Sequence, residues 1–106
     1  MPSNNWILPR PAESAIFRAL PEGGVLFSTE SEVYFGVNMV GARIWELMPP
    51  ATQTFGELID ALRSEYSDVS VDVIRGDATK FVEQLLSNGL VVSRLPEDVA
   101  SDARRP

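Results

Sequence analysis

The chain has 106 residues, of which 44% are hydrophobic and 23% are charged, a balance typical of one small globular domain. Nine lysines and arginines against fifteen aspartates and glutamates give a formal net charge of −6, which weighs against a partner held mainly through phosphate groups. The sequence has no cysteine and no histidine. Because this removes disulfides, thiol nucleophiles, most metal sites and the commonest acid-base side chain, we expect no enzyme, no cofactor and no metal site.

We expect no targeting signal in this sequence. The first five residues are polar and uncharged, without the basic start and apolar run of a signal peptide. No apolar run approaches the roughly 20 residues that span a bilayer, so we expect a cytoplasmic protein without membrane contact. Prolines punctuate the start, and large apolar side chains are scarce at the end. We therefore predict a loose segment over 1–14, a domain over 15–93 and a flexible tail over 94–106.

Three short apolar pieces with a strand-like period follow the N-terminal segment, over 15–20, 25–28 and 33–37. The stretches between them have the lengths of hairpin connections. The pattern predicts a three-stranded antiparallel meander. Alternation along the strands assigns one face to Val25, Phe27, Val33, Phe35 and Val37, and the other face to Leu26 and Tyr34.

After the third piece the hydrophobic period becomes helical. Asn38 is the predicted N-cap of a first helix, which the prolines at 49–50 end. Thr54 predicts a capping box at the start of a second helix, with its side chain on the amide of Glu57 and the Glu57 carboxylate on the amide of Thr54. We therefore expect two capped, amphipathic helices in this part of the chain.

A third helix is predicted between Ser70, its N-cap, and Gly89, its C-terminal stop. The predicted fold class is therefore α+β, a three-stranded antiparallel sheet followed by three helices. The short turn over 67–69 joins the last two helices as in a helix-turn-helix, and the hairpins beside it would make a winged version. This order alone does not fix a function.

Residues 34–47, which read Tyr-Phe-Gly-Val-Asn-Met-Val-Gly-Ala-Arg-Ile-Trp-Glu-Leu, resemble the strand-to-helix signature of PqqD-like proteins. Two later stretches resemble the family as well: Phe55-x-x-Leu58-Ile-x-x-Leu62 with Tyr66, and Asp77-x-x-x-Phe81-x-x-x-Leu85-x-x-x-Gly89-Leu90. Within the family the chain is most similar to the stand-alone leader-binding protein of lasso-peptide biosynthesis. The peptide chaperone of pyrroloquinoline quinone biosynthesis is the alternative.

PqqD-like domains are recognition elements for ribosomally made, post-translationally modified peptides (RiPP recognition elements). The resemblance implies that a precursor leader peptide lies as an extra strand against the third strand, beside the third helix. It also implies that the protein presents the precursor to a leader protease and possibly a cyclase. The physical basis is strand addition, in which main-chain hydrogen bonds give affinity and side-chain pockets give specificity.

The expected peptide-binding residues lie on the third strand and on one flank of the third helix. The strand lacks proline, so its amides are available for pairing. On the helix, the flank with Val73 at its margin is preferred to the opposite flank with Arg75. Aromatic residues of this set also fit an ordinary core. The full set is Val33, Tyr34, Phe35, Gly36, Val73, Ile74, Asp77, Lys80, Phe81 and Gln84.

Three other interpretations are open. A winged-helix DNA-binding protein would need a basic recognition helix, whereas residues 54–88 hold three basic and seven acidic residues. A small hydrolase would need a nucleophile and base that the sequence does not assemble. An exposed strand can also pair with its own copy, which makes a homodimer possible.

Overall fold

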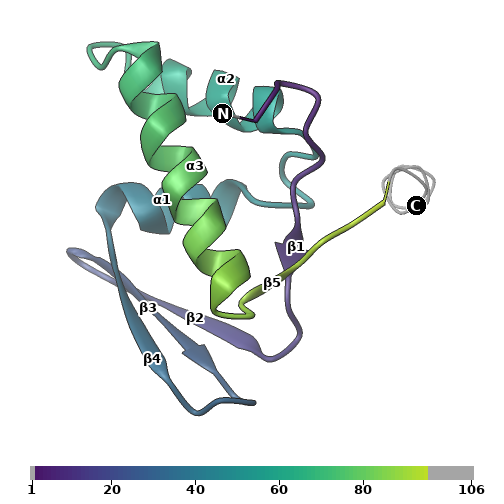
Figure 1. Ribbon diagram of the computed structural model, residues 1–106. Coiled ribbons are helices and arrows are strands. Elements are labelled where there is room, and N and C mark those ends of the chain that lie inside the picture. Colours follow the sequence, from purple (N-terminus) through teal and green to yellow (C-terminus); the bar gives the residue numbers. More distant parts are fainter. Residues whose placement is uncertain (1, 96–106) are drawn as a thin grey trace.

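The computed structural model describes residues 2–95. It has a three-stranded antiparallel sheet in the order β2-β3-β4, followed by three helices, and a two-stranded pair β1-β5. The bounds are β1 Arg10–Pro11, β2 Ala15–Leu20, β3 Gly23–Ser28, β4 Tyr34–Asn38, α1 Met39–Leu47, α2 Phe55–Glu65, α3 Val71–Ser87 and β5 Val91–Val92. Figure 1 shows the helices gathered on one side of the sheet. The predicted α+β class and the order of its elements are confirmed. Within the described residues no helix is both long and apolar enough to cross a membrane.

All three helices begin at the predicted N-caps. The side chains of Asn38, Thr54 and Ser70 each accept a hydrogen bond from an amide in the first turn, which satisfies one of the free donors at the helix start. The second half of the predicted capping box is wrong. The Glu57 carboxylate accepts at 2.8 Å from the amide of Gln53, one residue before the expected partner.

The cross-strand register decides which face of the sheet is buried. Leu26 pairs with Phe35 across β3 and β4, so both side chains lie on the face that the helices cover. Val25 and Phe27 lie on the opposite face together with Tyr34. The expected grouping of Val25 and Phe27 with Phe35 is therefore wrong. All three residues over 25–27 are apolar, so alternation alone could not fix the phase of this strand.

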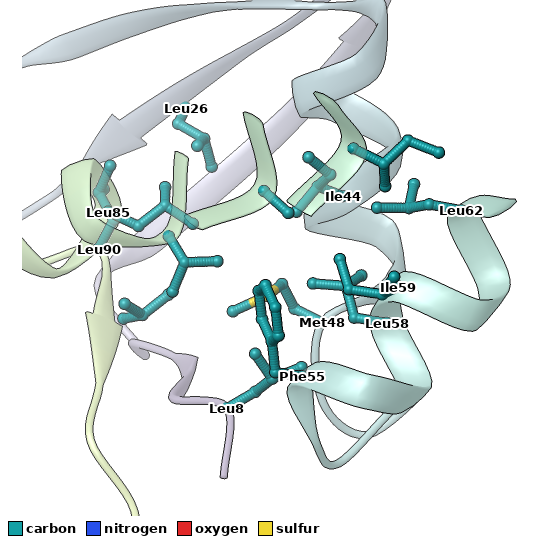
Figure 2. Close-up of a cluster of buried hydrophobic side chains, with 14 residues drawn as sticks. Leu8, Leu26, Ile44, Met48, Phe55, Leu58, Ile59, Leu62, Leu85 and Leu90 are labelled. Atoms are coloured by element: carbon teal, nitrogen blue, oxygen red, sulfur yellow. The ribbon is translucent and has the colours of Figure 1, made fainter. Parts of the chain in front are cut away.

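The hydrophobic core lies between the covered face of the sheet and the three helices. Figure 2 shows side chains from β3, all three helices, the segment before β1 and the turn after α3 converging there. Phe55 and Leu58 at the start of α2 are fully buried. The ten core residues labelled in Figure 2 are Leu8, Leu26, Ile44, Met48, Phe55, Leu58, Ile59, Leu62, Leu85 and Leu90.

The N-terminal segment belongs to the folded unit, which corrects the prediction of a loose stretch over 1–14 for the residues described. Leu8 is fully buried, and its amide donates to the Gln53 carbonyl at 3.0 Å. The amide of Phe55 donates to the Trp6 carbonyl at 2.8 Å, and the two rings lie 5.7 Å apart. The N-terminal segment is thus held on the fold despite its prolines, because burial of the apolar side chains around Leu8 stabilises the attachment.

The predicted boundary at residue 93 is also too early. Arg94 is only 8% exposed; its Nε donates to the Leu8 carbonyl and its Nη1 to the side-chain oxygen of Gln53, both at 2.8 Å. This guanidinium fastens the end of the described chain to the N-terminal segment beside the β1-β5 pair. From residue 96 onward the predicted flexible tail lies outside the described residues.

Candidate functional site

Strand β4 is an edge strand with main-chain groups that point away from the sheet. The Ser28 amide donates to the Val33 carbonyl at 3.1 Å, which places these residues in a hydrogen-bonded pair. Because such pairs alternate along an antiparallel ladder, Phe35 directs its amide and carbonyl toward β3, whereas Tyr34 and Gly36 direct theirs outward. Among residues 2–95 no further strand pairs with β4. The outward groups of Tyr34 and Gly36 therefore form an open ladder.

A bulge at the hairpin sets the start of this strand. Glu32 has a φ of 60°, and its amide donates to the Ser28 carbonyl at 2.8 Å. Two residues, Glu32 and Val33, thus face Ser28, which is the arrangement of a β-bulge. Val33 lies just before β4 and is 45% exposed, whereas the sequence pattern had placed it inside the strand.

A groove runs between this edge and helix α3. One part, of about 330 Å³, lies between the start of α1 and α3, and a second part, of about 260 Å³, lies between β4 and α3. Phe81 and Gln84 line both parts, so the two parts are adjacent along α3. We call this feature the β4-α3 groove. Its other lining residues used below are Phe35, Gly36, Asn38, Val40, Asp77 and Lys80.

The buried stripe of α3 determines which flank faces the groove. Ile74, Ala78, Val82 and Leu85 of this helix are buried, and residues one step around the helix from them lie at the margin of the core. On one margin Asp77, Lys80 and Gln84 line the groove, and all three belong to the preferred flank.

The opposite flank of α3 packs against the N-terminal segment instead. Arg75 donates to the Asn4 side chain at 2.6 Å and to the Pro2 carbonyl at 3.1 Å. Its guanidinium also lies 5.1 Å from the centre of the Phe55 ring. Arg75 therefore fastens the N-terminal segment to α3 and α2 and is not available to the groove.

The remaining expected residues fall in three environments. Phe35 and Phe81 are half-buried and join the core to the floor of the groove. Tyr34 is 70% exposed on the outer face of the sheet, with its ring 4.5 Å from that of Phe27. Ile74 is 6% exposed and Val73 is 51% exposed, and neither is among the described residues that line the two parts of the groove.

Ile74 instead borders a smaller apolar pocket of about 110 Å³, which shares Val40, Ile44 and Asp77 with the α1 end of the groove. The lining residues contributed by α1 and its cap were missed from the sequence: Asn38, Val40, Gly41 and Ile44. A signal for them existed, because α1 follows β4 without a loop and its first turn must continue along the same edge.

The charges of the groove are free to meet a ligand. Asp77 and Lys80 are exposed, and within the described part of the chain neither makes an ion pair. Helix α1 is joined to α2 by Arg43, whose guanidinium donates two-pronged hydrogen bonds of 2.7–3.0 Å to the Glu65 carboxylate. These hydrogen bonds hold the pKa of Glu65 below its ordinary value.

Comparison with known proteins bears directly on this region. The model of one protein family, described as coenzyme PQQ synthesis protein D (PqqD), matches residues 23–91, a stretch that includes β4, α1 and α3. The chain is also similar to a solved structure described as TbiB1 in complex with the TbiA(β) leader peptide. The TM-score is 0.71 and the sequence identity is 26%, covering 81% of this chain and 98% of that chain. No curated protein matches this sequence.

Proposed function

Because the chain belongs to the PqqD family, we propose that it is a RiPP recognition element that binds the leader of a ribosomally made precursor peptide. The observation that carries this proposal is the open ladder of β4 beside the β4-α3 groove. TbiB1, with which the chain shares its fold, has a leader peptide in its solved complex. The same activity is the one that the sequence resemblance implies.

The proposed binding mode is strand addition to β4. The outward amides and carbonyls of Tyr34 and Gly36 pair with the main chain of the leader, which gives affinity for any extended peptide without proline at the pairing positions. Alternate side chains of the leader then point into the groove. There Phe35 and Phe81 offer apolar contact, and the neighbouring charges on α3 offer a choice between acidic and basic partners.

Each predicted α3 residue has a role in this arrangement. Asp77 and Lys80 select leader charge, and Gln84 provides a hydrogen-bonding amide where the two parts of the groove meet. Ile74 supports the small apolar pocket at the α1 end. Val73, exposed one turn before Asp77, extends the same flank toward the start of the helix, where an apolar leader residue could contact it. Val33, before the strand, would contact the far end of the leader.

The protein acts in this proposal as a non-catalytic presenter. Holding the leader raises the effective concentration of the attached core peptide near the modifying enzymes, so that loss of the protein lowers processing without removing the chemistry. For a lasso pathway these enzymes are a leader protease and a cyclase, and the encounter takes place in the cytoplasm, where the precursor leaves the ribosome.

The family description favours a second candidate, a peptide chaperone of pyrroloquinoline quinone biosynthesis. It would use the same edge and groove for a different precursor, so the two candidates differ in the peptide that binds. A short precursor gene next to genes for a transglutaminase-like protease and an asparagine-synthetase-like cyclase would select the lasso candidate. Neighbouring pyrroloquinoline quinone genes would select the other.

A pair of substitutions at one position tests the proposed strand addition. Tyr34→Ala and Tyr34→Pro both remove the phenol ring, but only the proline removes the outward amide, which has no partner in the sheet. The probe is a fluorescein-labelled short peptide selected by display of a random library on the wild-type chain. We expect Tyr34→Pro to bind this peptide about fivefold to tenfold more weakly than Tyr34→Ala, the effect of one lost hydrogen bond.

A matched control lies at the opposite edge of the sheet. By the same alternation the amide of Ala19 in β2, which pairs with Gly24, points away from β3. Ala19→Pro should therefore leave peptide affinity unchanged. Equal affinities of Tyr34→Pro and Tyr34→Ala, or an equal loss in Ala19→Pro, would contradict strand addition at β4. Sedimentation of the wild-type chain with and without peptide shows whether a second copy of the chain occupies this edge.

A further inference from the structure

The outer face of the sheet carries apolar side chains that no other element covers in the described part of the chain. The helices pack on the opposite face, around Leu26 and Phe35. On the outer face Tyr34 is 70% exposed and Ile16 is 51% exposed. Phe27 lies between them in the register, and its ring contacts that of Tyr34. An apolar row thus crosses all three strands and ends at the open edge of β4.

Gly36 is a gap beside this row. It pairs with Val25 across the strands, and a Cβ built on it would meet nothing within 4 Å. Its φ is not positive, so its backbone conformation does not require glycine. A glycine inside a strand weakens the strand and often marks a place where a ligand or another backbone approaches closely. The fold itself gives no reason for the missing side chain.

A peptide strand that pairs with the open ladder of β4 would lie next to Gly36. Under the proposed function a peptide strand pairs with β4, and its side chains alternate between the groove and the outer face. The peptide residue beside Gly36 shares the face of Gly36, because directly opposite residues in a sheet lie on the same side. Its side chain would lie over Gly36, next to the ring of Tyr34, and would reach Val25.

We propose that Gly36 is a specificity-determining residue: it leaves a seat on the outer face of the sheet for one large apolar side chain of the bound peptide. The occupant is apolar because Val25 is the cross-strand partner of Gly36, and Phe27 and Tyr34 form the neighbouring cross-strand pair on the same face. The Asn38 side chain farther along β4 is occupied in capping α1. The chain therefore contacts its peptide on two sides: apolar, polar and charged side chains contact it in the groove, and a further apolar contact lies on the outer face. This inference rests on the proposed function and adds to it a site that selects one peptide side chain.

The test is a set of binding measurements with Gly36→Val and Gly36→Ala, which keep the outward amide and fill the seat to different degrees. The probe is the labelled peptide selected on the wild-type chain, together with its single-alanine variants. We expect Gly36→Val to weaken binding of the parent peptide about tenfold and Gly36→Ala to weaken it less. One alanine variant, which has lost a large apolar side chain, should bind wild type and Gly36→Val with equal affinity.

A periodicity control separates the seat from the groove. The alanine variant of the peptide whose affinity Gly36→Val does not change identifies the peptide residue in the seat. The corresponding variant for Lys80→Ala should lie an odd number of residues away, because successive side chains point to opposite faces. Unchanged parent affinity in Gly36→Val, or the same loss for every alanine variant, would overturn the inference. If Tyr34→Pro binds as well as Tyr34→Ala, the proposed function itself fails. If that pair behaves as expected while Gly36→Val binds normally, only the seat is refuted.

Discussion

Replacing Leu8 with alanine should destabilise the whole domain, although the residue lies outside the helices and strands, in the N-terminal segment before β1. Leu8 is fully buried and belongs to the core with Phe55 and Met48. Its amide and carbonyl are both held, the first by the Gln53 carbonyl at 3.0 Å and the second by Arg94 at 2.8 Å. The backbone therefore cannot move inward to fill the space that the missing side chain leaves.

The size of the loss follows from this restraint. Leucine-to-alanine changes at buried sites cost about 2–5 kcal/mol, and the larger values belong to cavities that cannot collapse. We expect Leu8→Ala to lower the free energy of unfolding by about 3–4 kcal/mol. A chain of this length has a total stability of roughly 5–15 kcal/mol, so the change removes a large share of it. The midpoint of thermal unfolding should fall by roughly 15–25 °C.

Urea unfolding followed by tryptophan fluorescence measures the effect, since Trp6 contacts Phe55 in the same region. Leu20→Ala is the matched control, because this leucine is 48% exposed at the end of β2 and should cost less than about 1 kcal/mol. If Leu8→Ala proves no more costly than Leu20→Ala, the N-terminal segment does not contribute to the core and the reasoning above is refuted.

Three further predictions concern the hairpin, an ion pair and nucleic acid. Gly23→Ala should cost at least about 2 kcal/mol in urea unfolding, because Gly23 has a φ of 145° and a Cβ there would collide with the Val37 carbonyl; a stability equal to that of Gly36→Ala would contradict this. Glu65→Gln should cost no more than about 1 kcal/mol at neutral pH. The pKa of Glu65 is lower in the fold than its ordinary 4.5, so its contribution is complete above that value and disappears as the pH falls through the lower folded value. A cost that persists in acid would refute that assignment. In a gel shift at low salt, a chain of net charge −6 should not retard duplex DNA, and tight, salt-sensitive binding would revive the winged-helix interpretation.

Local signals in the sequence were sufficient for the helix starts and for the two flanks of α3. Asn38 and Ser70 are short polar residues directly before helical periods, and a cap depends only on its own first turn. The helical period also places Asp77 and Lys80 on one flank of α3 and Arg75 on the other, at fixed angles from Ile74 and Ala78, but it does not decide which flank faces the groove. These features need no knowledge of the rest of the fold.

The features that sequence reasoning missed depend on contacts between distant residues. The burial of Leu26 is decided by its pairing with Phe35, because the neighbours of Leu26 in its own strand are equally apolar. The attachment of the N-terminal segment depends on Arg94 reaching the Leu8 carbonyl, across most of the chain. An arginine near a polar end is normally exposed, and nothing in the local pattern around Arg94 marks it as a fastening group.

In the proposed binding mode, main-chain pairing at β4 is separate from side-chain selection in the groove, and this separation has a consequence for engineering. Asp77, Lys80 and Gln84 are all exposed, and none of them belongs to the core cluster. They can therefore be exchanged as a set without disturbing the core, while the open ladder of β4, which would pair with any extended peptide, stays intact. Changing the peptide that the domain binds would then require substitutions at only a few surface positions.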